Sequence, residues 1–182
     1  NYGKLNNESD RLAIRNAVMT AARQLLAKCS SSSQIVSSDG QSYQDASTNA
    51  NANANANAAE NEHRFLAIKI ASLIADIATR DFPQRWTSFI SDLFSSPDKG
   101  GLWYIPPSTT SYRGYGPLIG VKMCLECLKI ITEDCTDGDF NSKISTSRRN
   151  DVLIGLNEVN QQFLPLIFEV LSSQYAAINA SK

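Results

Sequence analysis

The sequence predicts an all-α protein, and two observations lead to this fold class. Apolar residues recur every three or four positions in five segments of the 182-residue chain, as they do on one face of a helix. In two segments, 60–79 and 117–133, only a thin polar stripe interrupts a broad apolar surface, whereas an ordinary surface helix is polar over much of its circumference. Helices of this kind are covered on several sides, as in the middle layer of an α-solenoid of antiparallel helical hairpins. A compact bundle buries helices in the same way, so both arrangements fit the pattern.

The first helix is predicted over residues 9–28. Residues 29–59 follow and contain a serine run and the alternating stretch "NANANANAN". This composition is low in complexity and too poor in apolar side chains to offset the entropy lost on ordering. We therefore expect a disordered insertion there. The apolar face predicted for the first helix consists of Ile14, Val18, Ala21 and Leu25.

The second helix is predicted over residues 60–79, and a third over 82–94 follows it without a loop, at "RDFPQRWTSF" (80–89). Asp81 is expected to cap the third helix by accepting hydrogen bonds from its first free N–H groups. Pro83 is tolerated in a first turn, where its missing N–H costs nothing, but would break a continuing helix. Phe82 and Trp86 are four residues apart and would share one face. The segment therefore predicts a tight corner between two packed helices, with Trp86, Phe89, Ile90 and Leu93 facing inward.

Residues 95–116 are dense in Gly, Pro and Ser and are predicted to form a second long loop. Its aromatic residues either pin the loop to the protein or line a binding surface. They are Trp103, Tyr104, Tyr112 and Tyr115.

A fourth helix is predicted over 117–133, with Pro117 near its first turn, and a fifth over 146–173. Pro165 falls on the less apolar side of the fifth helix, where we expect it to kink the helix rather than end it. The polar stripe of the second helix is Lys69, Ser72, Asp76 and Thr79, and that of the fourth is Lys122, Glu126, Lys129 and Glu133. The stripe of the fifth is Asp151, Gly155, Glu158, Gln162, Pro165, Glu169 and Ser172.

The charge and the apolar content of the chain restrict the kinds of partner that it could bind. The chain carries 17 Lys and Arg against 18 Asp and Glu, a formal net charge of −1, which argues against a partner recognised mainly by charge. The most apolar stretch, 65–78, is interrupted by Lys69, Ser72 and Asp76, so we expect no membrane insertion. Since the chain starts at Asn1 and shows no leader pattern, we interpret residues 1–182 as a single fragment of a longer protein.

Cys124 and Cys127 have the CxxC spacing that can begin a zinc site, but a structural site usually needs a second pair of ligands. Both residues fall within an apolar helical pattern, and the lone histidine, His63, is distant in sequence. We expect this pair to be reduced and buried in the core. The other two cysteines are Cys29, at the start of the predicted insertion, and Cys135. Reduced cysteines fit the cytoplasm or nucleus.

The sequence offers little for catalysis, so we expect no enzyme and no catalytic, cofactor or metal site. His63 borders the insertion and is expected to be a solvated surface residue. The acidic turn 133–140 lacks the alternating ligands of a calcium loop. The stretch "TSRR" (146–149) fits a solvated helix start better than it fits two arginines that touch phosphate or an acidic partner.

The residues of the corner also carry a family resemblance. "IASLIADIATRDFPQRWTSFISDLF" (70–94) resembles a HEAT repeat of the importin-β superfamily, in the exportin-1-like region of nuclear export receptors. In that family a basic residue commonly ends the first helix, and an acidic residue, an aromatic, Pro and a nearby Trp open the second. The matching residues here are Arg80, Asp81, Phe82, Pro83 and Trp86.

A second likeness covers the last two predicted helices. "MCLECLKIITEDC" (123–135) and "SRRNDVLIGLNEVNQQFLPLIFEVL" (147–171) are similar in layout to the Hasty-type exportin, which carries structured small RNA. There, too, a helix with an acidic end leads through a short linker to a paired-Arg helix start.

The resemblance implies HEAT-type hairpins in which Asp81, Phe82, Pro83 and Trp86 make the fold. It implies a shuttling receptor of nucleus and cytoplasm that binds Ran-GTP, protein or structured small-RNA cargo, and Phe-Gly repeats of the nuclear pore. It assigns no Ran or cargo contact to a numbered residue. Two alternatives remain: a HEAT scaffold or regulatory subunit outside transport, and an all-helical enzyme that uses the 95–116 loop. A fragment of a solenoid is also expected to expose apolar faces that neighbouring repeats would cover.

Overall fold

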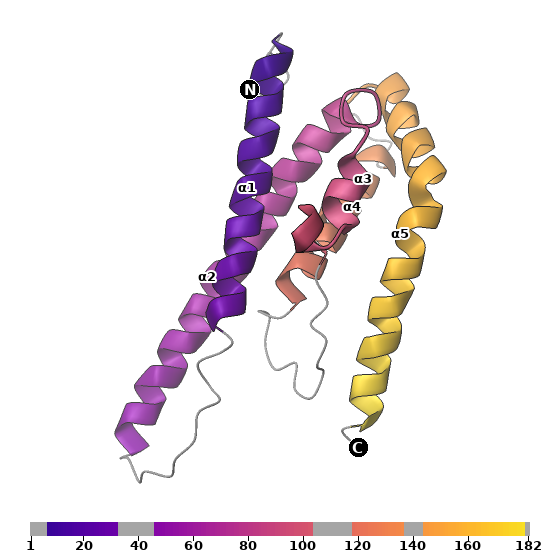
Figure 1. Cartoon of the computed structure of the whole chain (residues 1–182). Coiled ribbons are helices and arrows are strands. Elements are labelled where there is room, and N and C mark those ends of the chain that lie inside the picture. Colours follow the sequence, from indigo (N-terminus) through magenta and orange to yellow (C-terminus); the bar gives the residue numbers. More distant parts are fainter. Residues whose placement is uncertain (1–6, 33–45, 104–117, 137–143, 181–182) are drawn as a thin grey trace.

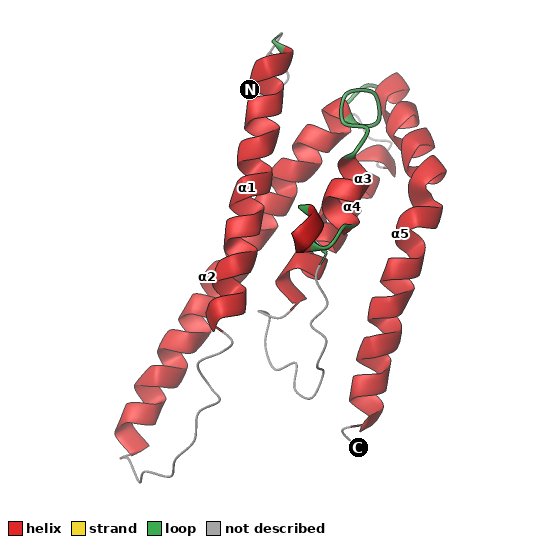
Figure 2. Cartoon of the chain, viewed as in Figure 1, coloured by secondary structure: helices red, strands yellow, loops and turns green. Residues whose placement is uncertain are grey.

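The computed structural model describes residues 7–32, 46–103, 118–136 and 144–180. Within these ranges the chain is helical and contains no strand, which confirms the predicted all-α class (Figures 1 and 2). The elements are α1 (Glu8–Ser32), α2 (Ala46–Asp81), α3 (Phe89–Phe94), the short 3₁₀ helix η2 (Pro97–Lys99), α4 (Ile119–Thr136) and α5 (Thr146–Ala180). None of these helices combines the length and the apolar character that a bilayer span requires.

Successive α-helices alternate in direction (Figure 1). α1 lies beside α2, and α2 also contacts α4 and α5. α4 in turn packs against α1, α2 and α5. α2 and α4 therefore lie in the middle of the packed helices, as their thin polar stripes predicted. The antiparallel pairs are the hairpins that a HEAT-type solenoid requires, and the solenoid itself stays a prediction.

The core is a single cluster of apolar side chains from all five α-helices. Four alanines on α2 are at most 1% exposed, and such small side chains let neighbouring helices approach closely. These residues are Ala67, Ala71, Ala75 and Ala78. At the other side of the core, the rings of Phe94 and Phe163 stack with their centroids 5.5 Å apart and join α3 to α5.

The face that α1 buries differs from the predicted one. Leu25 is buried, but Ile14 and Ala21 are exposed and Val18 is only half-buried. The buried face comprises Met19, Ala22, Leu25, Leu26 and Cys29. Both sets satisfy helical spacing, so periodicity alone could not choose between them; contact with α2 and α4 decides which one is covered.

The predicted disordered insertion over 29–59 is wrong in part. α1 continues to Ser32 and α2 begins at Ala46, so residues 46–59 extend the predicted 60–79 helix toward the N-terminus. Alanine has the highest helix propensity, and adding residues to an existing helix avoids the unfavourable nucleation step. Residues 33–45 lie outside the described part of the chain.

The C-terminal helices are longer than predicted. α4 ends at Thr136 rather than near residue 133, and α5 ends at Ala180 rather than near 173. α5 continues through Pro165 and is bent rather than straight (Figure 1), which agrees with the predicted kink. Pro117 lies outside the described residues.

The described part of the 95–116 loop is pinned to the core by an aromatic contact. Trp103 is buried and packs on Phe94 with ring centroids 4.9 Å apart. Leu102 N donates to Leu93 O at 3.1 Å, and Arg23 Nε donates to Gly100 O at 2.8 Å. The part up to Trp103 is therefore anchored, whereas Tyr104, Tyr112 and Tyr115 lie outside the described residues.

Candidate functional site

The corner after α2 is built around Asp81, but Asp81 does not cap a following helix as predicted. It is the last residue of α2, and its main-chain carbonyl accepts from Arg85 N at 2.7 Å and from Trp86 N at 3.1 Å. Residues 82–88 form a turn with a cis Phe82–Pro83 peptide, and α3 starts only at Phe89. The predicted third helix over 82–94 is therefore shortened to its second half.

The carboxylate of Asp81 is 1% exposed and is paired with cations from two elements. Arg11 Nη1 donates to Asp81 Oδ1 at 3.0 Å, and Arg85 Nη1 lies 3.9 Å from the same oxygen. A carboxylate buried this deeply must be paired, because burial of an isolated charge is very unfavourable. Asp81 thus ties the start of α1 to the end of α2.

Three aromatic residues fill the inside of the corner. Phe82, Trp86 and Phe89 are all at most 2% exposed, and the Phe89 ring centroid lies 5.3 Å from that of Phe82 and 5.0 Å from that of Trp86. Trp86 Nε1 donates to Asp92 Oδ2 at 2.6 Å, and the Arg15 guanidinium lies 5.2 Å from the Trp86 ring centroid. The predicted inward position of Trp86 is confirmed, but the prediction that Phe82 and Trp86 share one face of a helix is wrong, because both residues lie in the turn before α3.

α5 closes the corner through a glycine. A Cβ added to Gly155 would lie 2.9 Å from Phe82 Cε1 and 2.9 Å from Pro83 Cγ, closer than side-chain atoms pack. Gly155 is buried, so its predicted membership of a solvent-facing polar stripe is wrong. The absent side chain lets α5 approach the proline, and the sequence pattern alone gave no sign of this contact.

Arg148 at the start of α5 reaches across to the end of α2. Its Nε donates to Thr79 O at 2.8 Å, and its other nitrogens donate to Phe82 O and to Gln84 Oε1. Burial lowers the pKa of the guanidinium, and the Asp151 and Asp81 carboxylates oppose this shift. Arginine still remains a cation at physiological pH. Arg148 therefore fixes α5 to the corner, which corrects the prediction that 146–149 is merely a solvated helix start.

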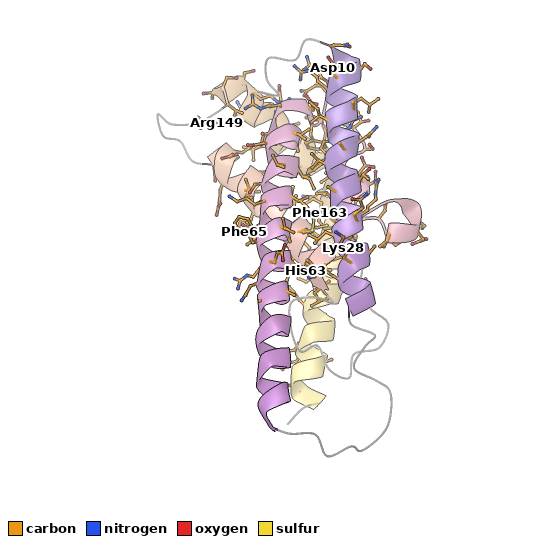
Figure 3. All side chains as sticks on the ribbon, turned by 90° about the vertical axis from the view of Figure 1, so that its left-hand side faces the viewer. Asp10, Lys28, His63, Phe65, Arg149 and Phe163 are labelled. Carbon is orange, nitrogen blue, oxygen red and sulfur yellow. The ribbon has the colours of Figure 1, made fainter. Side chains whose placement is uncertain are left out.

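An open pocket of about 250 Å³ lies at this corner. Figure 3 labels Asp10 and Arg149 at this end of the molecule, and they are the sequence neighbours of the pocket residues Arg11 and Arg148. Its lining carries four guanidinium groups and, among the described residues, no acidic side chain. The lining residues are Arg11, Arg80, Arg85, Ile144, Ser145 and Arg148. The pocket has the chemistry of an anion site, because forked guanidinium donors match carboxylate and phosphate oxygens.

A second, larger groove of about 500 Å³ lies between α2 and α4. Ile68 and Leu125 supply apolar surface, and it is bordered by Arg64, Lys122, Glu126 and Lys129. Phe65 is 59% exposed on the same helix as Ile68 (Figure 3), and Lys69 Nζ lies 5.4 Å from its ring centroid. This groove offers apolar surface with a mostly basic border.

The remaining candidates from the sequence carry no chemistry in the described structure. Cys29, Cys124, Cys127 and Cys135 are free and buried, which confirms the prediction that Cys124 and Cys127 are core cysteines. The burial of Cys29 differs from its predicted place in the insertion, because α1 continues through it. Cys124 Sγ donates to Leu93 O at 3.3 Å, and burial raises the pKa of the Cys124 and Cys127 thiols. His63 is half-buried on α2 (Figure 3). In the described ranges no three His, Cys, Asp or Glu side chains come together as a metal site would need.

The corner lies within the region that the chain shares with known proteins. The family model described as "Exportin 1-like protein" matches residues 63–181, which run from the middle of α2 to the end of α5. The chain is also 22% identical over 117 residues to Exportin-5 of Dictyostelium discoideum, a match that covers 63% of this chain and 9% of that protein. The chain thus spans about a tenth of the length of this relative. No solved structure gives a significant match. On the family match over more than half of its length, the chain belongs to the exportin-1-like family of the importin-β superfamily, as a HEAT-repeat region.

Proposed function

We propose that the chain is a segment of a nuclear transport receptor, an exportin that binds Ran-GTP and cargo and shuttles between nucleus and cytoplasm. The observation that carries this proposal is the family match over residues 63–181, which includes the corner, α4 and α5. The proposed role is binding and transport without catalysis. Because the chain corresponds to only 9% of its relative, the activity belongs to the whole protein.

The distribution of exposed apolar side chains supports a place within a longer array of repeats. α5, the last helix described, exposes Ile154, Phe168, Leu171 and Tyr175, each at least 58% accessible. Phe168, Leu171 and Tyr175 are three and four residues apart and share one face of α5, and exposed apolar surface of this kind usually marks an interaction site. In a solenoid each repeat contacts only its neighbours, and a following hairpin would cover this face.

The groove between α2 and α4 supports the proposed contact with Phe-Gly repeats. Ile68 and Leu125 present apolar surface between two helices, with space beside them for an aromatic ring. Contacts of this size are individually weak, as rapid passage through a pore requires.

The near-neutral charge of the chain affects which kind of cargo this segment could attract. A formal net charge of −1 gives this segment little general attraction for phosphate backbones. For a structured small-RNA cargo, we therefore propose that other parts of the receptor supply most of the contacts. A protein cargo needs no such charge excess.

The test is a pull-down of the full-length protein with Ran loaded with GTP and, as the matched control, with GDP. Binding to the GTP form alone supports the transport receptor. Absence of binding to either form removes the transport proposal and favours the alternative, a HEAT scaffold or regulatory subunit that organises other proteins. A Ran mutant locked in the GTP state separates nucleotide dependence from incomplete loading.

A further inference from the structure

We propose that the arginine-lined pocket at the α1–α2–α5 corner binds an acidic segment of a partner protein through its carboxylates. The inference goes beyond the proposed transport function and does not depend on Ran binding. It starts from the four guanidinium groups that share one open pocket of about 250 Å³.

The four arginines divide into two structural and two available ones. Arg11 and Arg148 hold the corner together: Arg11 pairs with the buried Asp81, and Arg148 donates to the Thr79 and Phe82 carbonyls. Arg85 is 51% exposed and reaches Asp81 only at 3.9 Å. Within the described part of the chain, the Arg80 side chain takes part in no hydrogen bond or ion pair. Arg80 and Arg85 therefore retain donors that the fold does not use.

The local electrostatics also favour an anion. The C-terminal carbonyls of a helix carry partial negative charge, but at the end of α2 those of Ala78, Thr79 and Asp81 accept hydrogen bonds from Arg148 or from main-chain N–H groups of the turn. The first turn of the 35-residue helix α5, whose N-terminal end carries partial positive charge, starts beside Ser145 in the pocket lining. The guanidinium groups repel one another, and a bound carboxylate would relieve this repulsion.

The shape of the positive surface favours an acidic peptide over RNA. Four cations gather in this one pocket, whereas the border of the α2–α4 groove contains Glu126 as well as lysines, and the chain as a whole has a net charge of −1. Nucleic-acid backbones are tracked by extended basic surfaces with several phosphate contacts. A single pocket of forked donors instead fits one or two carboxylates of Asp or Glu side chains.

The experiment measures binding of a fluorescein-labelled hexapeptide of alternating Glu and Asp to the full-length protein by fluorescence anisotropy. The variant Arg80→Gln/Arg85→Gln removes the two available cations and leaves Arg11 and Arg148 in place. The matched control, Lys28→Gln/Lys99→Gln, removes two exposed cations that line neither the pocket nor the α2–α4 groove. The expected result is an affinity loss of at least about tenfold for the pocket variant and less than about twofold for the control.

The proposal would be overturned if the pocket and control variants bound the labelled peptide with equal affinity. It would also be overturned if unlabelled acidic peptide displaced the labelled peptide no better than a Gln/Asn peptide of equal length. Tighter binding of an RNA hairpin with the same dependence on Arg80 and Arg85 would assign the pocket to nucleic acid instead. Binding of inorganic phosphate without binding of the peptide would reduce it to a small-anion site. Thermal unfolding of both variants checks that neither loses its fold. The Ran pull-down, done on the same proteins, reports separately on the transport function.

Discussion

Arg11 and Asp81 lie 70 positions apart in the sequence, yet the Arg11 guanidinium donates to the buried Asp81 carboxylate at 3.0 Å. The pair joins the first turns of α1 to the last residue of α2. It also places Arg11 in the lining of the arginine pocket, so the same contact stabilises the fold and shapes the candidate site.

Replacing Asp81 by Ala should destabilise the chain by about 3–5 kcal/mol, because removing one partner of a buried ion pair leaves the other charge uncompensated. This is more than the roughly 0.5–2 kcal/mol expected for loss of a helix cap. Urea unfolding followed by circular dichroism measures the change.

A double-mutant cycle with Arg11→Ala identifies the cause. The two substitutions should be strongly non-additive, with a coupling free energy of about 1–3 kcal/mol. Simple additivity would show that Asp81 acts independently of Arg11.

Trp86→Ala should lower the free energy of unfolding by about 3–5 kcal/mol, because it empties the middle of the aromatic corner. Trp86 is 1% exposed and touches Phe89, and its Nε1 also donates to Asp92. The control is Phe65→Ala, at a residue that is 59% exposed, where a change within about 0.5 kcal/mol is expected. Similar losses for both variants would mean that the corner contributes no special stability.

Gly155→Ala tests whether a methyl group at this position stabilises or destabilises the folded chain. An Ala in place of Gly inside a helix normally stabilises by up to about 1 kcal/mol. Here the new methyl group would lie 2.9 Å from Phe82 and Pro83, so a loss of about 1–3 kcal/mol from overpacking is expected. Asn157→Ala, at an exposed residue of the same helix, is the control. Stabilisation by Gly155→Ala would disprove the close contact between α5 and the corner.

The buried thiols predict a loss of stability at alkaline pH. Burial raises the pKa of Cys124 and Cys127 above the ordinary value of 9.0, so the folded chain keeps these protons at pH values where the unfolded chain releases them. Their contribution to stability is complete below about pH 9 and declines as the pH rises further, by up to about 1.4 kcal/mol per pH unit for each thiol.

The variant Cys124→Ala/Cys127→Ala isolates this effect from the titration of lysine and tyrosine. The slope of unfolding free energy against pH between 9 and 10.5 should be shallower in the variant than in the parent chain. Equal slopes would show that the two thiols ionise alike in the folded and unfolded states.

Local sequence patterns predicted the helices well because helical periodicity is a property of neighbouring residues. The described residues of the segments 9–28, 60–79, 117–133 and 146–173 are all helical, and Trp86, Phe89, Ile90 and Leu93 are all buried. The end of α2 at the residues before Pro83 was also predictable, since proline cannot continue a helix. The family resemblance rested on the same short stretch.

By itself the sequence determined an all-helical chain with a proline corner and a family membership, because each of these depends on residues close together along the chain. Only the tertiary structure decided that Asp81 pairs with Arg11 instead of capping α3. It also decided that Pro83 packs against Gly155 and that Arg148 donates a hydrogen bond to the end of α2. It also gathered four arginines into one pocket, three from helices α1, α2 and α5 and one from the turn after α2. These contacts join residues that are distant in sequence, and helical spacing carries no information about which faces of different helices meet.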